Sequence, residues 1–214
     1  MTTIPDPEEP ERSPSAVPEG LVAAHAPGLE LDLQLDETLA AADDWHPDER
    51  FVLGWAREAL AGATDGERGT VHGERAGSCL LAVRLVERET MRALNRDWRG
   101  RDAPTNVLSF PAELPALDPE TFAGDERAAR VPLRVLGDLA LCPAVIAAEA
   151  RAQGKRADDH WAHLIVHGVL HLLGHDHEDA TEAEAMEALE RRLLARRDLP
   201  DPYAAPSSGT ADAF

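Results

Sequence analysis

The segment from residue 167 to residue 177 constrains this chain more than any other part of its sequence, which here reads His-Gly-Val-Leu-His-Leu-Leu-Gly-His-Asp-His. His167 and His171 are four residues apart, so a helix places both side chains on one face, one turn apart. Gly174 tolerates positive φ, and such a residue commonly ends a helix and reverses the chain. His177 could then fold back, so the spacing predicts three imidazole groups gathered at the end of one helix.

Three histidines and one open position form the ligand set of a catalytic zinc site. The helix in front of them is apolar, which favours a buried, shaped site; its apolar residues are Trp161, Leu164, Ile165, Val166, Leu170, Leu172 and Leu173. We therefore predict one Zn²⁺ ion per chain, bound by His167, His171 and His177. Imidazole also suits nickel, copper and iron, so the ligands alone leave the choice of metal open.

The same spacing, His-x3-His-x2-Gly-x2-His, occurs in the metzincin proteases, which makes a metalloprotease-like hydrolase one alternative. Those enzymes carry a glutamate directly after the first histidine, where it acts as the general base. This chain has Gly168 at that position, and glycine cannot accept a proton. The histidine geometry is retained, while the chemistry must differ.

Length and composition indicate one acidic domain with flexible ends, because 214 residues carry 40 acidic and 21 basic side chains. No apolar run approaches the roughly 20 residues that span a bilayer, and the first residues lack the basic start and apolar core of a signal peptide. We therefore expect a cytoplasmic protein that has no membrane partner. Cys79 and Cys142 fall in expected strands, where they are interpreted as buried thiols in a reducing compartment.

A net charge of −19 argues against a nucleic-acid partner, because an acidic surface repels phosphate. The distribution of the charge changes this conclusion. Between residues 84 and 101 three acids face six arginines, an excess of three positive charges; the arginines are Arg84, Arg88, Arg92, Arg96, Arg99 and Arg101. This segment could bind phosphate, although a solvated helix face explains Arg88 and Arg92 equally well.

Hydrophobic periodicity and turn residues predict an α+β fold, a single domain with a central mixed sheet of about four strands flanked by about five helices. The expected strands are 29–35, 78–86, 106–110 and 135–142, and the expected helices are 47–61, 87–98, 143–153, 156–173 and 181–196. The helix over 156–173 is the metal-binding one. A capping box of Thr181 with Glu184 is expected to start the last helix.

The two ends of the chain are expected to lie outside the folded domain. Residues 1–24 form an acidic, proline-rich extension with almost nothing to bury, so we expect disorder there. The domain is expected to span residues 25–203, and residues 204–214 form a flexible tail of small side chains. Within the domain, the polar segment 112–134 is expected to be a surface loop near the site.

Four stretches resemble the bacterial YbeY family of endoribonucleases. Residues 167–177 are similar to the family signature His-Gly-x-Leu-His-Leu-x-Gly-x-Asp-His, and similar stretches occur at 94–111, 136–142 and 184–203. The resemblance extends over about residues 29–203 and implies a central sheet of about four strands with helices around it. Trp98 and His175 stand where family members commonly have tyrosine, and neither is a ligand position.

This resemblance implies a zinc-dependent, single-strand-specific endoribonuclease that acts in 3′-end maturation of 16S ribosomal RNA, ribosome biogenesis and ribosome quality control. Its implied partners are precursor ribosomal RNA, other single-stranded RNA and components of the small ribosomal subunit. The implied zinc ligands are again His167, His171 and His177, and the family's functional arginine falls on Arg99. Arg99 and His167 are the expected catalytic residues, since arginine can pair with phosphate through two parallel hydrogen bonds. A non-catalytic ribosome-assembly factor with structural zinc is a further alternative.

The residues leave the general base unassigned. His175 could accept a proton near neutral pH, although a solvent-facing turn histidine explains it better. Asp176 could instead hold a ligand imidazole, and Asp138 could do the same or simply end a strand. His163 lies one turn before His167 and could either line the cleft or pack against its neighbours.

Overall fold

The computed structural model describes residues 28–41, 46–64, 79–112, 134–175 and 179–204. Their elements follow in the order β1 (Leu29–Leu35), α1 (Glu37–Ala41), α2 (Glu49–Thr64), β2 (Cys79–Leu85), α3 (Arg88–Arg99), β3 (Val107–Pro111), β4 (Arg134–Leu141), α4 (Pro143–Gln153), α5 (Ala157–Leu172) and α6 (Ala180–Ala195). The expected α+β class is confirmed. These ranges hold six helices, and the short α1 is the one that the sequence pattern did not reveal.

The four strands form one mixed sheet in the order β1-β2-β4-β3. Strands β1, β2 and β4 run parallel, whereas β3 pairs antiparallel with β4 and lies at an edge. In β2 every second side chain is buried, because alternate residues of a strand point to opposite faces. The face so formed carries Leu81, Val83 and Leu85 toward the larger core.

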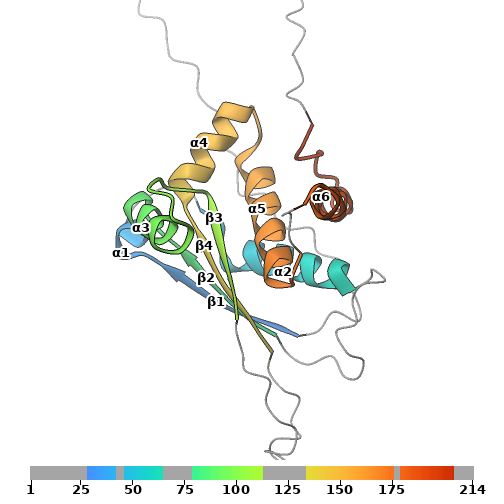
Figure 1. Ribbon diagram of the computed structural model, residues 1–214, viewed down its shortest axis with the longest axis horizontal. Coiled ribbons are helices and arrows are strands. Elements are labelled where there is room, and N and C mark those ends of the chain that lie inside the picture. Colours follow the sequence, from blue (N-terminus) through green and yellow to red (C-terminus); the bar gives the residue numbers. More distant parts are fainter. Residues whose placement is uncertain (1–27, 42–45, 65–78, 113–133, 176–178, 205–214) are drawn as a thin grey trace, which may run out of the picture.

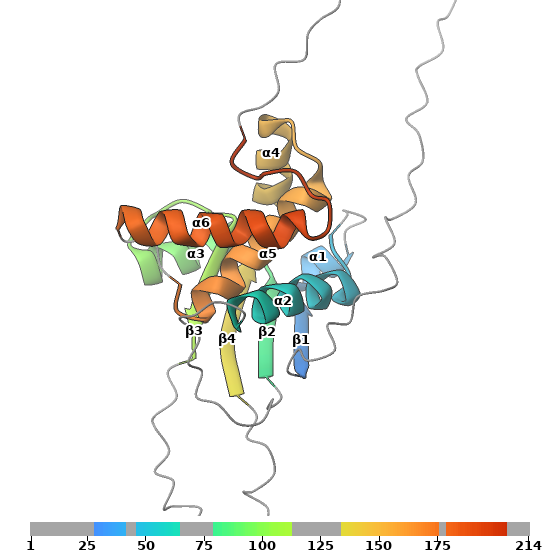
Figure 2. The same ribbon diagram turned by 90° about the vertical axis from the view of Figure 1, so that its right-hand side faces the viewer.

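Helices lie on both faces of this sheet (Figures 1 and 2). On one face α2, α5 and α6 enclose the larger apolar core, which includes Val83, Leu139, Trp161 and Ile165. On the other face α3 lies over a smaller apolar cluster formed by Val86, Met91, Leu108, Ala140 and Cys142. Helix α5 is buried along most of its length because it lies between the sheet and two other helices. This packing fixes the direction in which its polar side chains can point.

Capping by aspartate explains where two of the helices, α2 and α6, begin. Helix α2 begins at Glu49 because the Asp48 carboxylate accepts the backbone N–H of Phe51 at 2.8 Å. The capping box of Thr181 with Glu184 is wrong: Asp179 caps α6, accepting the N–H groups of Thr181 and Glu182 at 2.8 Å each. A carboxylate at this position satisfies two orphan donors and also complements the positive end of the helix dipole.

Several expectations fall on parts of the chain outside the described residues. These are the extension 1–24, nearly all of the loop 112–134, and the tail beyond residue 204. The two cysteines lie within the described residues, and both are buried free thiols, although Cys142 follows β4 and precedes α4 rather than lying in the strand. No helix in the described ranges is long and apolar enough to cross a membrane.

The register of β3 against β4 can be tested at Gly137. This residue has φ +133°, and an added Cβ would lie 2.2 Å from the Phe110 carbonyl oxygen and 2.9 Å from the Ala112 nitrogen. We expect Gly137→Ala to lower the free energy of unfolding by about 2–3 kcal/mol or more, because backbone atoms cannot easily move away. The measurement is urea denaturation followed by circular dichroism.

Gly54, in helix α2, is the matched control. An added Cβ there meets nothing within 4 Å, so Gly54→Ala should raise the free energy of unfolding by about 0.5–1 kcal/mol. A Gly137→Ala protein as stable as the unmodified chain would contradict the β3–β4 register.

Candidate metal centre

Helix α5 carries four histidines whose rings follow one another along its length: His160, His163, His167 and His171. The ring centroids of consecutive pairs lie 6.3, 6.0 and 4.6 Å apart. In the closest pair, the Nε2 atom of His171 lies 3.2 Å from the Nε2 atom of His167. The two rings therefore meet across one helical turn, as their four-residue spacing predicts.

The chain reverses directly after this pair. Gly174 has φ +90°; its N–H donates to the His171 carbonyl, and the N–H of His175 donates to the Leu170 carbonyl, both at 3.0 Å. These two bonds form a Schellman motif, which explains why α5 ends at Leu172. Residues 176–178 lie outside the described part of the chain, so the role of His177 as third ligand stays a prediction.

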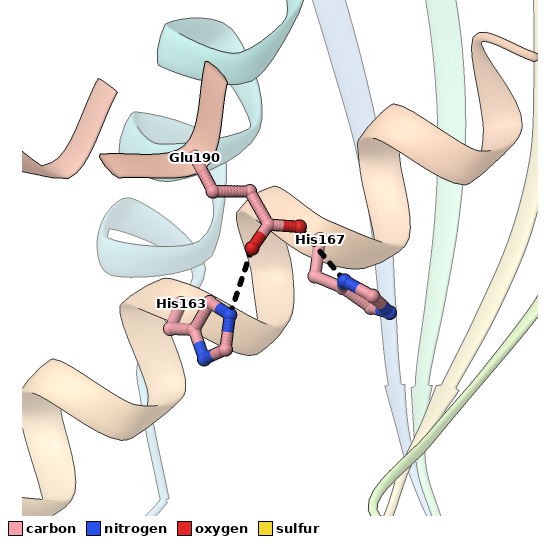
Figure 3. A group of neighbouring side chains, drawn as sticks. All are labelled: His163, His167 and Glu190. Atoms are coloured by element: carbon pink, nitrogen blue, oxygen red, sulfur yellow. Dashed lines mark hydrogen bonds and ion pairs between the residues drawn. The ribbon is translucent and has the colours of Figure 1, made fainter. Parts of the chain in front are cut away.

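The Glu190 carboxylate, from α6, connects two of these histidines (Figure 3). Its Oε1 atom lies 2.8 Å from Nδ1 of His167, and its Oε2 atom lies 3.0 Å from Nε2 of His163. Glu190 is 0% exposed. An ionised carboxylate only accepts hydrogen bonds, so both rings must donate to it. A neutral His167 then has its proton on Nδ1 and its lone pair on Nε2, the atom that faces His171.

The hydrogen bonds keep Glu190 ionised despite its burial. Burial by itself raises the pKa of this carboxyl group, but the hydrogen bonds from His163, His167 and Tyr203, together with the electrostatic attraction to the His167 ring, lower the pKa to about 2. Burial and the adjacent Glu190 carboxylate in turn raise the pKa of the Tyr203 phenol. Glu190 is therefore a buried negative charge beside the two rings.

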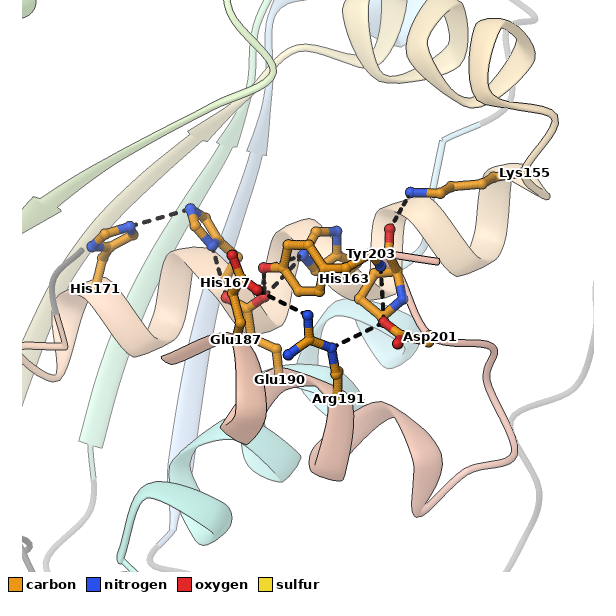
Figure 4. Close-up of polar contacts among 10 residues, drawn as sticks. Lys155, His163, His167, His171, Glu187, Glu190, Arg191, Asp201 and Tyr203 are labelled. Atoms are coloured by element: carbon orange, nitrogen blue, oxygen red, sulfur yellow. Dashed lines mark hydrogen bonds and ion pairs between the residues drawn. The ribbon is translucent and has the colours of Figure 1, made fainter. Parts of the chain in front are cut away.

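Tyr203 reaches this carboxylate from the segment that follows α6 (Figure 4). Its hydroxyl group donates to Oε2 of Glu190. Asp201 accepts the N–H of Tyr203 at 2.9 Å and pairs with Arg191 at 3.3 Å, and the Arg191 guanidinium lies 4.7 Å from the centre of the Tyr203 ring. The segment that follows α6 is thus held against that helix in a position that completes the hydrogen bonding of Glu190.

The polar groups allow two positions for a metal ion. Single ligand atoms of His163, His167 and Glu190 all lie within 4.8 Å of one another, so this group could hold an ion. In that group, however, both carboxylate oxygens are already hydrogen-bonded to the two rings. Two nitrogens on one tetrahedral zinc ion lie about 3.3 Å apart for bonds of about 2.0–2.1 Å. The Nε2 separation of 3.2 Å between His167 and His171 fits that requirement.

Gly168 lies where α5 packs against the sheet. An added Cβ would lie 2.9 Å from a methyl carbon of Leu139 and 3.4 Å from the hydroxyl oxygen of Ser109. The Ser109 hydroxyl also donates to the Gly168 carbonyl at 3.2 Å. The position that holds the metzincin glutamate therefore faces β3 and β4 in this protein. A larger side chain there would require Leu139 to repack.

Arg99, the last residue of α3, is exposed and reaches strand β3. Its Nη2 atom donates to the Ser109 carbonyl at 3.2 Å, and Ser109 in turn contacts Gly168, the neighbour of His167. A guanidinium group has five N–H donors, so this contact leaves donors for another ligand. The structure thus connects Arg99 to the histidine-bearing helix through a single residue of β3.

The other residues that the sequence singled out as candidates are His175, Asp138 and His163. His175 is partly buried, and burial lowers its pKa. Asp138 is exposed on β4; because its neighbour Leu139 faces Gly168, Asp138 points to the opposite side of the sheet and away from α5. His163 is a hydrogen-bond partner of Glu190, which agrees with the packed alternative.

Sequence reasoning missed Glu190 as a functional residue, although a signal was present. The buried residues of α6 are Met186, Leu189, Glu190, Leu193 and Leu194, which follow the i, i+3, i+4, i+7, i+8 pattern of one helix face. An acidic residue within an otherwise apolar stripe needs a buried partner. That pattern indicates a paired carboxylate, while the identity of its partners depends on the packing of α6 against α5.

This chain matches a known protein family. The family described as "Endoribonuclease YbeY" matches residues 57–198. A protein of that name from Alkalilimnicola ehrlichii is 49% identical over 83% of this chain and 93% of its own length. A protein of the same name from Stutzerimonas stutzeri is 46% identical over 85% of this chain and 96% of its own length. Another from Halorhodospira halophila is 57% identical over 58% of this chain and 73% of its own length.

The fold and the polar cluster define an α+β protein with a candidate metal centre on a helix that lies across the sheet. Within that class, the matches identify the family: the chain belongs to the YbeY endoribonuclease family.

The buried charge of Glu190 predicts a pH dependence of stability. A carboxyl group whose pKa is lowered in the folded state stabilises the fold above its unfolded pKa, and this contribution is lost as the pH falls toward the folded pKa of about 2. We expect Glu190→Gln to destabilise the metal-free protein at pH 6. Its deficit relative to the unmodified chain should shrink by about 2 kcal/mol between pH 6 and pH 3.

Urea denaturation at the two pH values measures this difference. Glu187→Gln is the control on the same helix, since Glu187 forms a partly exposed pair with Arg191 at 2.9 Å and such pairs contribute little. A deficit for Glu190→Gln that is equal at both pH values would contradict an ionised Glu190.

Proposed function

We propose that this protein is a zinc-dependent endoribonuclease that cleaves single-stranded RNA in the bacterial cytoplasm. Its proposed substrate is precursor 16S ribosomal RNA on or near the small ribosomal subunit, in 3′-end maturation and ribosome quality control. The observation that carries the proposal is the pair of facing imidazoles on α5, which lies within the segment that matches the family. Residues 25–203 would form the catalytic domain.

In this proposal His167, His171 and His177 hold the zinc ion. A zinc ion bound by three neutral imidazoles lowers the pKa of a water ligand to about 7 in favourable sites, which supplies a nucleophile for phosphodiester hydrolysis. Glu190 accepts a hydrogen bond from the Nδ1–H group of His167, which keeps the proton on Nδ1 and the lone pair on Nε2, the atom that faces His171. A carboxylate behind a ligand histidine also raises the basicity of that ligand.

Arg99 has the second role in the proposed reaction. Arg99 contacts Ser109, and Ser109 contacts Gly168, the neighbour of His167. We propose that the remaining N–H groups of Arg99 bind a phosphate oxygen beside the histidines. Arginine keeps its charge at every relevant pH and can hold two phosphate oxygens at once. Negative charge grows on those oxygens during hydrolysis, so a guanidinium group fixed there stabilises the transition state more than the ground state.

The protease alternative is disfavoured by the environment of Gly168. The side of α5 that would carry a glutamate packs against Leu139 and Ser109, so it has no route to a substrate. We therefore favour RNA over peptide as the substrate.

The proposed ligands predict a specific loss of metal. The unmodified protein should hold about one zinc ion per chain, and His171→Ala should lose most of it, because the remaining ligands bind the ion weakly. His163→Gln should keep its zinc, since this residue belongs only to the alternative group with Glu190. Metal analysis of each purified protein, with a thermal melt to check folding, decides between the two positions. Retention in His171→Ala with loss in His163→Gln would place the ion at His163, His167 and Glu190.

The reaction itself is tested with single-stranded RNA and casein in parallel. We expect zinc-dependent cleavage of RNA and none of casein. Arg99→Ala should keep its zinc and lose roughly 10²-fold or more in single-turnover rate at saturating enzyme, the scale for removal of one oxyanion donor. Arg99→Lys should also be impaired, because lysine cannot form two parallel bonds. Arg88→Ala, an exposed position on the same helix, is the control and should cleave at nearly the normal rate.

A further inference from the structure

We propose that Trp98 is a stacking platform for a nucleobase of the RNA, and that Arg99 and Arg101 hold the phosphates on either side of that base. This inference rests on the proposed endoribonuclease function and adds to it the part of the protein that recognises an unpaired base. It follows from the exposure of Trp98, from the distribution of ion pairs on α3 and from the contacts of β3.

The exposure of Trp98 is unusual for an indole. It is 69% exposed, whereas Trp55 and Trp161 are 6% and 1% exposed. Among the described residues, the only other exposed large apolar side chain is Tyr203, whose hydroxyl group is bonded to Glu190. The Trp98 ring also packs at 72° against Phe110, with ring centroids 5.5 Å apart, so its orientation is supported. An oriented aromatic ring in solvent is suited to accept a flat partner.

The arginines near α3 divide into two groups. Carboxylates neutralise Arg84, Arg92 and Arg96, through Asp36 at 2.7 Å, Asp102 at 2.8 Å and Asp97 at 2.8 Å. Arg99 and Arg101 are exposed, and in the described ranges neither forms an ion pair with a carboxylate. Arg88, at the start of α3, is also exposed and has no ion pair in these ranges, so two of the three uncompensated arginines of this segment lie at the end of α3, beside Trp98. The pairing of Arg92 with Asp102 shows that not every arginine of this segment is available to phosphate.

Strand β3 connects this platform to the candidate metal centre. Phe110 contacts Trp98, and the adjacent Ser109 contacts both Arg99 and Gly168. Because β3 is an edge strand, a phosphate on Arg99 would lie at the edge of the sheet beside β3, and the neighbouring base could reach the indole. Aromatic rings interleaved with cations are the usual means of binding single-stranded nucleic acid without reading its sequence. A paired base is stacked inside a duplex and cannot reach such a ring, so the platform favours single strands.

The test is a double-mutant cycle between protein and RNA. The RNA is a 12-nucleotide single strand, either intact or with one abasic site placed in turn at each position near the cleaved bond. The proteins are the His171→Ala background, which binds without cleaving, and the same background with Trp98→Leu or Trp98→Phe. Dissociation constants are measured by fluorescence anisotropy of labelled RNA at fixed salt.

We expect Trp98→Leu to weaken binding of intact RNA about tenfold or more, and Trp98→Phe to retain most of the affinity, because stacking needs an aromatic face. One abasic position should weaken binding to the background protein by a similar factor and have little further effect on Trp98→Leu, because the same contact is already lost. Indole emission of the background protein should be quenched by intact RNA and not by that abasic RNA.

Equal affinity of Trp98→Leu and its background for intact RNA would overturn the proposal, as would additive losses at every abasic position. If Trp98→Leu in the otherwise unmodified protein cleaves free RNA normally but no longer associates with small ribosomal subunits, Trp98 contacts a protein and the proposal is wrong. Failure of the unmodified protein to bind or cleave any RNA would instead remove the proposed function, which separates the two conclusions.

Discussion

The hydrogen bonds of the buried Glu190 carboxylate connect three parts of this protein that are distant in sequence. The carboxylate comes from α6, its two imidazole donors come from α5, and its third donor, Tyr203, comes from the segment that follows α6. A charge that is 0% exposed is costly unless every oxygen is paired. The need to satisfy this one group therefore fixes α6 against α5 and, with it, the orientation of His167.

The same helix is fixed on its other side by the sheet. Gly168 allows α5 to approach β3 and β4 to ordinary van der Waals contact, and the Ser109 hydroxyl bonds to the helix backbone there. Between the sheet and α6, the helix has little freedom to rotate. A metal centre built from side chains one turn apart benefits from such a rigid support, because its geometry then costs little to organise when the ion binds.

An acidic protein that is proposed to bind RNA must keep its negatively charged side chains away from the binding surface, because they repel phosphate. Here the net charge of −19 coexists with an arginine segment in which several guanidinium groups serve the fold rather than a ligand. Arg92, for example, makes two hydrogen bonds with Asp102 and so stabilises the turn after α3. Two exposed arginines without such partners in the described residues, Arg99 and Arg101, stand at the end of that helix, next to an exposed indole. Charge arrangement, rather than total charge, is what makes a nucleic-acid surface compatible with this composition.

Sequence determined the features of this protein that depend on neighbours along the chain. The facing of His167 and His171 follows from helix geometry, the end of α5 follows from Gly174, and the bounds of α4 follow from Pro143 and Gly154. The family, too, is read from local motifs. Where two local solutions have similar energies, as with Asp179 and Thr181 at the start of α6, the pattern indicated the wrong one.

Only the tertiary structure decided the contacts between distant segments. Glu190 lies 27 residues from His163 and 23 from His167, and Arg99 reaches β3 across 10 residues. Periodicity could show that Glu190 belongs to a buried face, but it could not show which side chains face it across the interface. The physical reason is that a helix pattern fixes directions around its own axis, whereas the partner of a buried polar group is set by how separate elements pack.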